Sequence, residues 1–245
     1  MINANLPIQL KPQHAFKLIR LGKKNDGGYS IGYNSVYHSK VLISLGLSDD
    51  WSFEKHFKRT NPRLNILCFD DTLDLYYMVK TFFQQCLRFF FFRSNYLVRS
   101  FVNIFDYLFF IKKKIKKKRI SYNDIQSITK RFNKKIFIKM DIEGSEYRVL
   151  NDLIKIKKKL TGLAIEFHDV DLNIKKILSF NKKIGLKLVN IHANSGGAIE
   201  NNFPTTIELA YDKDPVVEEK FFVYPSKIDQ INRITDVDIK ILFKK

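Results

Sequence analysis

The chain has 245 residues, 45% of them hydrophobic, which predicts a folded domain with a sizeable core and excludes a disordered tail. Its formal net charge is +18, from 43 basic and 25 acidic residues. This charge suits a polyanionic partner, but an abundance of Lys, Ile, Asn and Phe is also typical of AT-rich genomes, so charge alone decides no function.

Cysteine content and apolar segments indicate the compartment. The two cysteines, Cys68 and Cys86, are too few for a disulfide framework, and Cys68 lies in an apolar run typical of a buried strand. The first ten residues lack both the basic and the long apolar segment of a secretory signal. The chain has no stretch of about 18 uncharged apolar residues, so we expect no simple transmembrane helix. We therefore expect a cytoplasmic protein.

Apolar runs separated by turn residues recur at the spacing of strand–helix–strand units. We expect strands over residues 40–45, 64–69, 136–140, 163–167, 186–191 and 207–211, the last two as an antiparallel pair. We expect helices over residues 52–60, 146–155 and 172–183. This alternation indicates a single α/β domain over residues 1–245, with a doubly wound, mostly parallel sheet and helices on both faces.

Residues 73–118 depart from this pattern, because they are crowded with phenylalanines and end in six lysines around Ile115. Within residues 96–111, polar Arg99, Asn103 and Asp106 share one narrow helical stripe, and the rest is apolar. A wide apolar face beside a lysine block is typical of a helix at a membrane surface, so residues 96–118 are a candidate membrane contact.

Structural explanations of this insert that need no membrane remain open. A helix pair could pack on the sheet, or bury its face in a homodimer, with a solvated lysine loop after it. The aromatic residues follow helical spacing and no recognisable RNA-binding motif, which disfavours a nucleic-acid partner.

Ligands of open α/β sheets bind beyond the carboxyl ends of the strands, so residues at those ends are informative. Gly46 follows the first strand of the sheet and would let the backbone approach a ligand closely. Asp70 follows the second strand, where an acid commonly binds the ribose hydroxyls of a nucleotide-like cofactor. A helix cap at Asp71 or Thr72 is the alternative.

The densest polar run follows the third strand. Asp141 and Glu143 alternate along the chain, so both side chains can point the same way, and helix capping explains only part of the run. Two neighbouring carboxylates need a cation, a proton or hydrogen-bond donors. Glu166 and His168 repeat this alternation after the next strand, and His192 follows the one after that. Acids and histidines on adjacent strand ends predict a general base or a site for a hard cation.

Taken together, these motifs resemble those of the FkbM-type methyltransferases, which have the Rossmann-like class I methyltransferase fold. The resemblance covers roughly residues 18–211, and the run Lys139–Glu146 is its most specific piece, followed by Asp26–Tyr29. The other matching segments are Arg20–Gly22, Ser44–Asp50, Ser52–Glu54, Phe69–Thr72, Ile165–His168, Ile191–Asn194 and Thr206–Glu208. Two departures stand out: the first glycine motif keeps one glycine, and the insert at 73–118 does not look like the family core.

The resemblance implies a seven-stranded sheet, S-adenosylmethionine as methyl donor, and methylation of a hydroxyl group, often on a sugar. By position, Gly46, Asp70 and Asp141 would bind the cofactor, and Asp141 and Glu143 would face the junction with the acceptor. Methyl transfer to a hydroxyl needs in-line alignment and removal of the proton, for which His168 is the expected base, with Asp141 as second candidate. A divalent cation such as Mg²⁺, held by Asp141, Glu143 and His192, would be another way to lower the pKa of the hydroxyl.

Three hypotheses for the function follow. The first is O-methylation of a bacterial surface glycan or its lipid-linked precursor, with the insert at the inner face of the membrane. The second is nucleic-acid methylation, which only the charge favours, since the chain lacks an Asn-Pro-Pro-Tyr-like motif. The third is a non-catalytic scaffold of a membrane complex, which would have no need of acids and histidines at the strand ends.

Overall fold

The computed structural model describes residues 2–92, 96–218, 223–233 and 235–244. Its centre is a seven-stranded sheet with the order β10-β13-β9-β8-β5-β6-β7. The strands are β5 (Val41–Leu45), β6 (Asn65–Asp70), β7 (Ile115–Lys117), β8 (Ile136–Met140), β9 (Leu160–Phe167), β10 (Lys187–Ala193) and β13 (Ile207–Asp212). All run parallel except β13, which is antiparallel to both neighbours, β9 and β10. In chain order this is 3-2-1-4-5-7-6 with a reversed seventh strand, the arrangement of class I methyltransferases, so the predicted fold class is confirmed.

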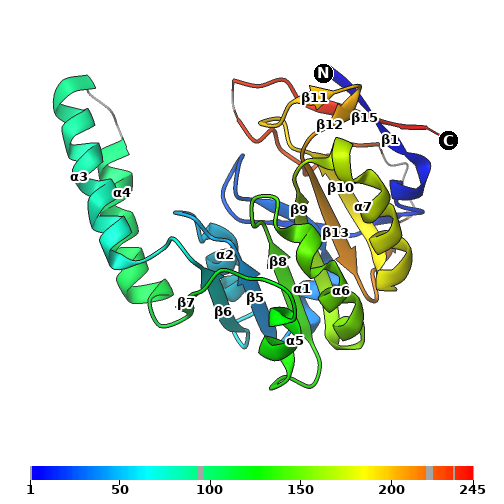
Figure 1. Ribbon diagram of the computed structural model, residues 1–245, viewed down its shortest axis with the longest axis horizontal. Coiled ribbons are helices and arrows are strands. Elements are labelled where there is room, and N and C mark those ends of the chain that lie inside the picture. The colour runs from blue at the N-terminus through cyan, green and yellow to red at the C-terminus, as the bar shows by residue number, and fades with distance from the viewer. Residues whose placement is uncertain (1, 93–95, 219–222, 234, 245) are drawn as a thin grey trace.

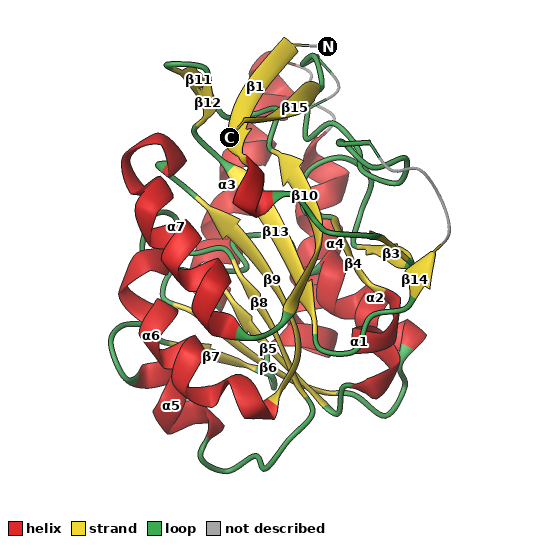
Figure 2. Ribbon diagram, turned by 90° about the vertical axis from the view of Figure 1, so that its right-hand side faces the viewer, coloured by secondary structure: helices red, strands yellow, loops and turns green. Residues whose placement is uncertain are grey.

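Helices cover both faces of the sheet (Figures 1 and 2). One face carries α5 (Asp124–Thr129), α6 (Glu146–Ile156) and α7 (Val170–Ile184), and the other carries α1 (Tyr33–His38) and α2 (Ser52–Thr60). Strand β8 shows why both layers form. Ile136 and Ile138 belong to the core under α6 and α7, whereas Phe137 belongs to the core with Phe53 and Phe57 of α2, because successive side chains of a strand point to opposite faces.

The register of the sheet aligns the ends of four strands. Leu45 pairs with both Phe69 and Met140, and Met140 pairs with Ile165. The residues that follow or end these strands therefore form one row across the sheet, and the candidate site lies on that row.

The insert forms a helical hairpin of α3 (Leu75–Phe92) and α4 (Tyr96–Asp106), extended by one π-helical turn, η2 (Tyr107–Ile111). Figure 1 shows the hairpin standing away from the body beside β6 and β7. The hairpin is therefore not packed along the sheet. The lysine block is a loop only in part: residues 112–114 form a turn, whereas Ile115–Lys117 forms edge strand β7, in which Ile115 is partly buried and two lysines are exposed. Exposed lysines on an edge strand discourage unwanted strand pairing.

Smaller elements surround the sheet. The pairs are β1 (Ile2–Pro7) with β15 (Ile239–Lys244), β2 (Ala15–Phe16) with β14 (Val217–Glu218), β3 (Leu18–Leu21) with β4 (Tyr29–Gly32), and β11 (Ile199–Glu200) with β12 (Phe203–Pro204). Short 3-10 turns are η1 (Ile8–Leu10) and η3 (Lys157–Lys159). None of the helices in the described part of the chain is long and apolar enough to cross a membrane.

Candidate active site

A cavity of about 380 Å³ lies over the carboxyl ends of β5, β8 and β9, within the range of small-molecule sites, ~300–1,000 Å³. Its charged lining is mostly acidic. Seven acidic residues face four basic ones there: Asp26, Asp49, Asp50, Glu54, Asp141, Glu143 and Glu166 against Lys23, Lys139, Arg233 and His168. In a chain with a net charge of +18, this reversal of sign is local to the cavity.

Tyr29 links the acids at the ends of two neighbouring strands. Its hydroxyl lies 3.1 Å from Asp141 Oδ2 and 3.2 Å from Glu166 Oε2, so it can donate to either carboxylate. Burial raises the pKa of Tyr29 well above its ordinary value, and both carboxylates raise it further, so the hydroxyl keeps its proton. Tyr29 ends the Asp-Gly-Gly-Tyr motif that the sequence analysis noted without assigning it a role.

The ammonium of Lys139 neutralises part of the negative charge of these acidic side chains. This buried ammonium lies 3.6 Å from Asp141 Oδ2 and donates to the carbonyl oxygen of Gly46 at 2.8 Å. Burial alone would lower the pKa of Lys139, but the Asp141 and Glu54 carboxylates outweigh it and raise the pKa. Lys139 therefore stays charged under the cavity, a role that its place in an apolar strand did not reveal.

Glu166 lies in an environment that disfavours its charged form. Burial, followed by the charges of Asp141 and Glu208, raises the pKa of Glu166 to about 8. Asn194 Nδ2 donates to its Oε1 at 3.0 Å and fixes the side chain. A carboxylate that binds a proton near neutral pH and faces a cavity is suited to general acid–base chemistry.

His168 lies among acids from two elements. Its Nδ1 is 3.1 Å from Glu146 Oε1, and its Nε2 is 3.5 Å from Glu143 Oε2 and 3.6 Å from Glu166 Oε1. Burial alone would lower the pKa of His168, but the hydrogen bond and charge of Glu146 outweigh it and raise the pKa to about 9. The general-base role expected for His168 is therefore not supported at neutral pH, because an imidazolium has no free lone pair. Because the pKa of Glu166, about 8, is the lower of the two, Glu166 loses its proton first as the pH rises and is the first of the pair to become available as a base.

The same residues form a candidate cation site. Asp141, Glu143 and His168 each offer a ligand atom, and these atoms all lie within 4.8 Å of one another. The predicted set had His192 in place of His168. A cation here would compete with the proton on His168, so its binding would strengthen with rising pH.

His192 lies elsewhere because β13 separates β10 from β9. Its Nδ1 is 3.4 Å from Glu208 Oε2, and its Nε2 is 3.7 Å from Asp238 Oδ1 near the end of the chain. Burial alone would lower the pKa of His192, but Glu208 and then Asp238 raise it to about 10. His192 thus joins the carboxyl-terminal segment to the sheet, away from Asp141 and Glu143.

Two of the three residues expected to bind the cofactor, Gly46 and Asp70, shape the loops after β5 and β6. Gly46 has φ +76°, and a Cβ there would come within 1.7 Å of the Asp141 carbonyl oxygen, so only glycine lets the loop after β5 meet the end of β8. The Asp70 carboxylate is buried and accepts backbone N–H bonds from Leu47 and Ser48 on Oδ2, at 2.8 and 3.0 Å. Its Oδ1 accepts three more bonds, from the hydroxyl and N–H of Thr72 and the N–H of Leu73. The ribose role of Asp70 stays a prediction, and its structural role is the joining of two loops.

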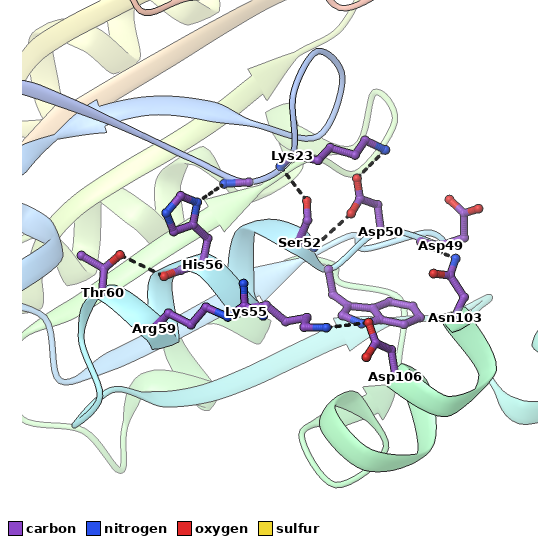
Figure 3. A pocket seen from close by; sticks show the side chains of 12 residues that line it. Lys23, Asp49, Asp50, Ser52, Lys55, His56, Arg59, Thr60, Asn103 and Asp106 are labelled. Carbon is purple, nitrogen blue, oxygen red and sulfur yellow. Dashed lines mark hydrogen bonds and ion pairs between the residues drawn. The ribbon is translucent and has the colours of Figure 1, made fainter. Parts of the chain in front are cut away.

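A second, larger pocket of about 600 Å³ adjoins the first and shares Lys23, Asp49 and Asp50 with it. Figure 3 shows its walls, which come from the loop before β4, from α2 and from α4. Two ion pairs, Lys23–Asp50 and Lys55–Asp106, each close at 2.6 Å across its rim. Its side chains are mainly polar and of both charges, which suits a neutral ligand rich in hydrogen-bonding groups.

No model of a known protein family matches the chain, and no curated protein matches it either. Solved structures similar to it include a Methanococcus jannaschii fibrillarin pre-rRNA processing protein, with 14% identity over 81% of this chain and 82% of that one (TM-score 0.38). A precorrin-6y C5,15-methyltransferase from Geobacter metallireducens has 10% identity over 74% and 87% (TM-score 0.38). A human methyltransferase 10 domain containing protein has 13% identity over 72% of each chain (TM-score 0.36). The fold assignment itself rests on strand order and direction, which define a class I methyltransferase fold.

Proposed function

We propose that this protein is an S-adenosylmethionine-dependent methyltransferase that acts on a hydroxyl group of a sugar. The observation that carries the proposal is the acidic cavity over the strand ends of a class I methyltransferase fold, in an otherwise basic chain. A cluster of carboxylates attracts a cationic ligand and repels a phosphate. The resemblance to the FkbM-type methyltransferases adds support from the motifs that line this cavity.

The residues present fit such a cofactor. S-adenosylmethionine supplies an electrophilic methyl group on a positively charged sulfur and also carries an ammonium group. Glu54 Oε2 is buried beside the cavity and has no hydrogen-bond partner among the described residues, while its Oε1 accepts from Ser44 at 2.5 Å. Burial raises the pKa of Glu54, and a cation in the cavity would favour its charged form.

The proposed chemistry uses the acids at the ends of β8 and β9. Glu166 faces the cavity and, in its ionised form, would accept the proton of the acceptor hydroxyl. This form prevails above its pKa of about 8, and a cationic cofactor beside it would favour ionisation at lower pH. Tyr29 and Asn194 hold the Glu166 carboxylate in place. Asp141, one strand away, would offer negative charge to the cationic cofactor, and His168 stays protonated beside Glu166.

The two linked pockets support a sugar as the acceptor. The larger pocket is lined by hydroxyl, amide, carboxylate and ammonium groups, which can hydrogen-bond the hydroxyls of a sugar. Nucleic-acid methylation is disfavoured, since a phosphate chain would have to approach the acidic cavity. A non-catalytic scaffold gives no reason for the perturbed Glu166 and His168 pair.

Calorimetric titration with S-adenosylmethionine and S-adenosylhomocysteine tests the proposal, with and without magnesium. We expect saturable binding of both, and Asp141→Asn should weaken binding of S-adenosylmethionine more than that of S-adenosylhomocysteine, which lacks the sulfonium charge, by roughly tenfold. Asp171→Asn, at a partly exposed acid in the first turn of α7, is the matched control and should bind as wild type does. Folded wild-type protein that binds neither compound would refute the methyltransferase proposal.

A further inference from the structure

Helix α4 is amphipathic, but its orientation is the opposite of that of an ordinary surface helix: polar residues face the protein and apolar residues face outward. Its polar residues Asn103 and Asp106 face the body, where Asn103 Nδ2 donates to the Asp49 carbonyl at 3.3 Å and Asp106 pairs with Lys55. Its apolar stripe, which continues into η2, is exposed instead and comprises Val98, Phe101, Val102, Phe105 and Phe109. A helix that turns its polar stripe inward and its apolar stripe outward gains nothing by this within the monomer.

The π-helical turn η2 sharpens this division. Tyr107 and Ile111 are buried against Trp51 and Met78, whereas Phe109 between them is 84% exposed. Single π-helical turns are rare and are often found at functional sites. Here the turn keeps the hairpin anchored at its base while it presents a phenylalanine outward.

Helix α3 continues the apolar surface. Tyr76, Phe83 and Leu87 are exposed at the spacing of one helical stripe. Phe82 joins the two helices, because its ring centre lies 6.0 Å from those of both Phe83 and Phe101. The rings of Phe101, Phe105 and Phe109 extend the series, with centres 4.9 and 6.4 Å apart. We call these exposed stripes of α3, α4 and η2 the hairpin face.

The charge around the hairpin face selects its partner. Residues 75–119 contain eleven basic residues and one acidic residue, Asp106, which is already paired with Lys55. Exposed Lys112 and Lys113 directly follow the stripe, and three more exposed lysines follow in and after β7. A second copy of this chain would bring the same positive charge to the contact, whereas an anionic bilayer offers both an apolar interior and complementary charge.

We propose that the hairpin face docks on the surface of a bilayer containing anionic lipids. The phenylalanines insert below the headgroups, and the lysines that follow them contact the headgroups. This contact does not depend on methyl transfer, so it can hold or fail separately from the proposed activity. It makes the protein a peripheral membrane protein whose attachment weakens with salt.

Co-sedimentation with vesicles tests the proposal, using phosphatidylcholine alone and phosphatidylcholine mixed with phosphatidylglycerol. We expect wild-type protein to bind the mixed vesicles and to remain in solution with the neutral ones. Phe109→Ser should weaken binding by about tenfold, and Lys112→Gln with Lys113→Gln by about fivefold for each lysine. Leu172→Ser, on α7 and 79% exposed, is the matched control and should bind as wild type does.

Circular dichroism should show the same helix content for all variants, and the lysine variant tests the surface without altering ring contacts. The proposal would be overturned if wild-type protein did not bind the mixed vesicles, or if it bound the neutral vesicles as strongly as the mixed ones. So would a Phe109→Ser variant that binds mixed vesicles as wild type does. A wild-type dimer that dissociates in Phe109→Ser without any vesicle binding would assign the hairpin face to a second copy of the chain. Binding to single-stranded RNA in place of vesicles would assign it to nucleic acid.

Discussion

Replacing Asp70 by asparagine separates its two roles. If the carboxylate only binds ribose, Asp70→Asn should weaken cofactor binding and leave the free energy of unfolding unchanged. The structure predicts a large loss of stability instead, because both oxygens accept hydrogen bonds from the loops after β5 and β6. An asparagine keeps one oxygen and turns an NH₂ group toward N–H donors on the other side.

The magnitude follows from the bonds that are lost. If the amide nitrogen faces Leu47 and Ser48, two hydrogen bonds to a charged acceptor disappear, each worth about 1.5–3 kcal/mol. We therefore expect Asp70→Asn to lower the free energy of unfolding by ~3–6 kcal/mol, a large part of the ~5–15 kcal/mol of a typical domain. Cofactor binding should fall as well, because the displaced loop lines the cavity.

Urea unfolding at pH 7 measures this loss, and exposed Asp71→Asn is the matched control, expected to stay within about 0.5 kcal/mol of wild type. Burial alone would raise the pKa of Asp70, but its hydrogen bonds from Leu47 and Thr72 lower it below 3.8. A lowered folded-state pKa means that this stabilisation is present above pH 3.8 and is lost as the pH falls below it. Unchanged unfolding of Asp70→Asn at pH 7 would refute the structural role.

Three further predictions concern the surroundings of the cavity. Gly46→Ala should lower the free energy of unfolding by more than ~2 kcal/mol in urea unfolding, since its Cβ would overlap the backbone at the end of β8; an unchanged midpoint would contradict this. Tyr29→Phe removes the donor to Glu166 and should raise the Glu166 pKa above about 8, as measured by carboxyl NMR titration; a lowered pKa would contradict it. The Glu208 carboxylate contributes to the rise of the His192 pKa from 6.5 to about 10, so the stabilisation is full below pH 6.5 and is lost as the pH rises to 10. His192→Gln should therefore cost ~3–5 kcal/mol at pH 6 and far less above pH 10, and a pH-independent loss would contradict this.

Apolar periodicity predicted most of the sheet, because buried parallel strands are continuous apolar runs between turn residues. It did not predict β7, in which Ile115 is followed by two lysines. An edge strand is paired on one side only, so it needs little apolar sequence, and its pairing with β6 is visible only in three dimensions. The small strands β1 and β15 were missed for a similar reason, since they pair with each other from opposite ends of the chain.

The site residues were predicted from their positions at the ends of strands. The prediction failed where a residue's partners lie far away in the sequence. The acids at the ends of β8 and β9 do converge, as the parallel register requires. The charge state of His168 could not be predicted, because it depends on Glu146 and Glu166, from different elements. His192 was placed in the wrong group because β13, which the chain reaches later, inserts between β9 and β10. The order of strands in the sequence indicates the direction of a strand more readily than it indicates which strands lie beside it in the sheet.

The charge of this chain is divided between two surfaces with opposite requirements. The cavity is acidic and suits a cationic cofactor and an acceptor without phosphates at the reacting end, whereas the hairpin face is apolar and rimmed by lysines. Helix α4 lies between the two, since Asn103 and Asp106 line the larger pocket that adjoins the cavity, while the opposite stripe is part of the hairpin face. A molecule with a neutral sugar at one end and a lipid with an anionic linkage at the other would meet both requirements at once. The two proposals together therefore predict that mixed vesicles carrying such an acceptor support methyl transfer, and that Phe109→Ser slows it at low vesicle concentration and leaves the reaction of a detached sugar unchanged.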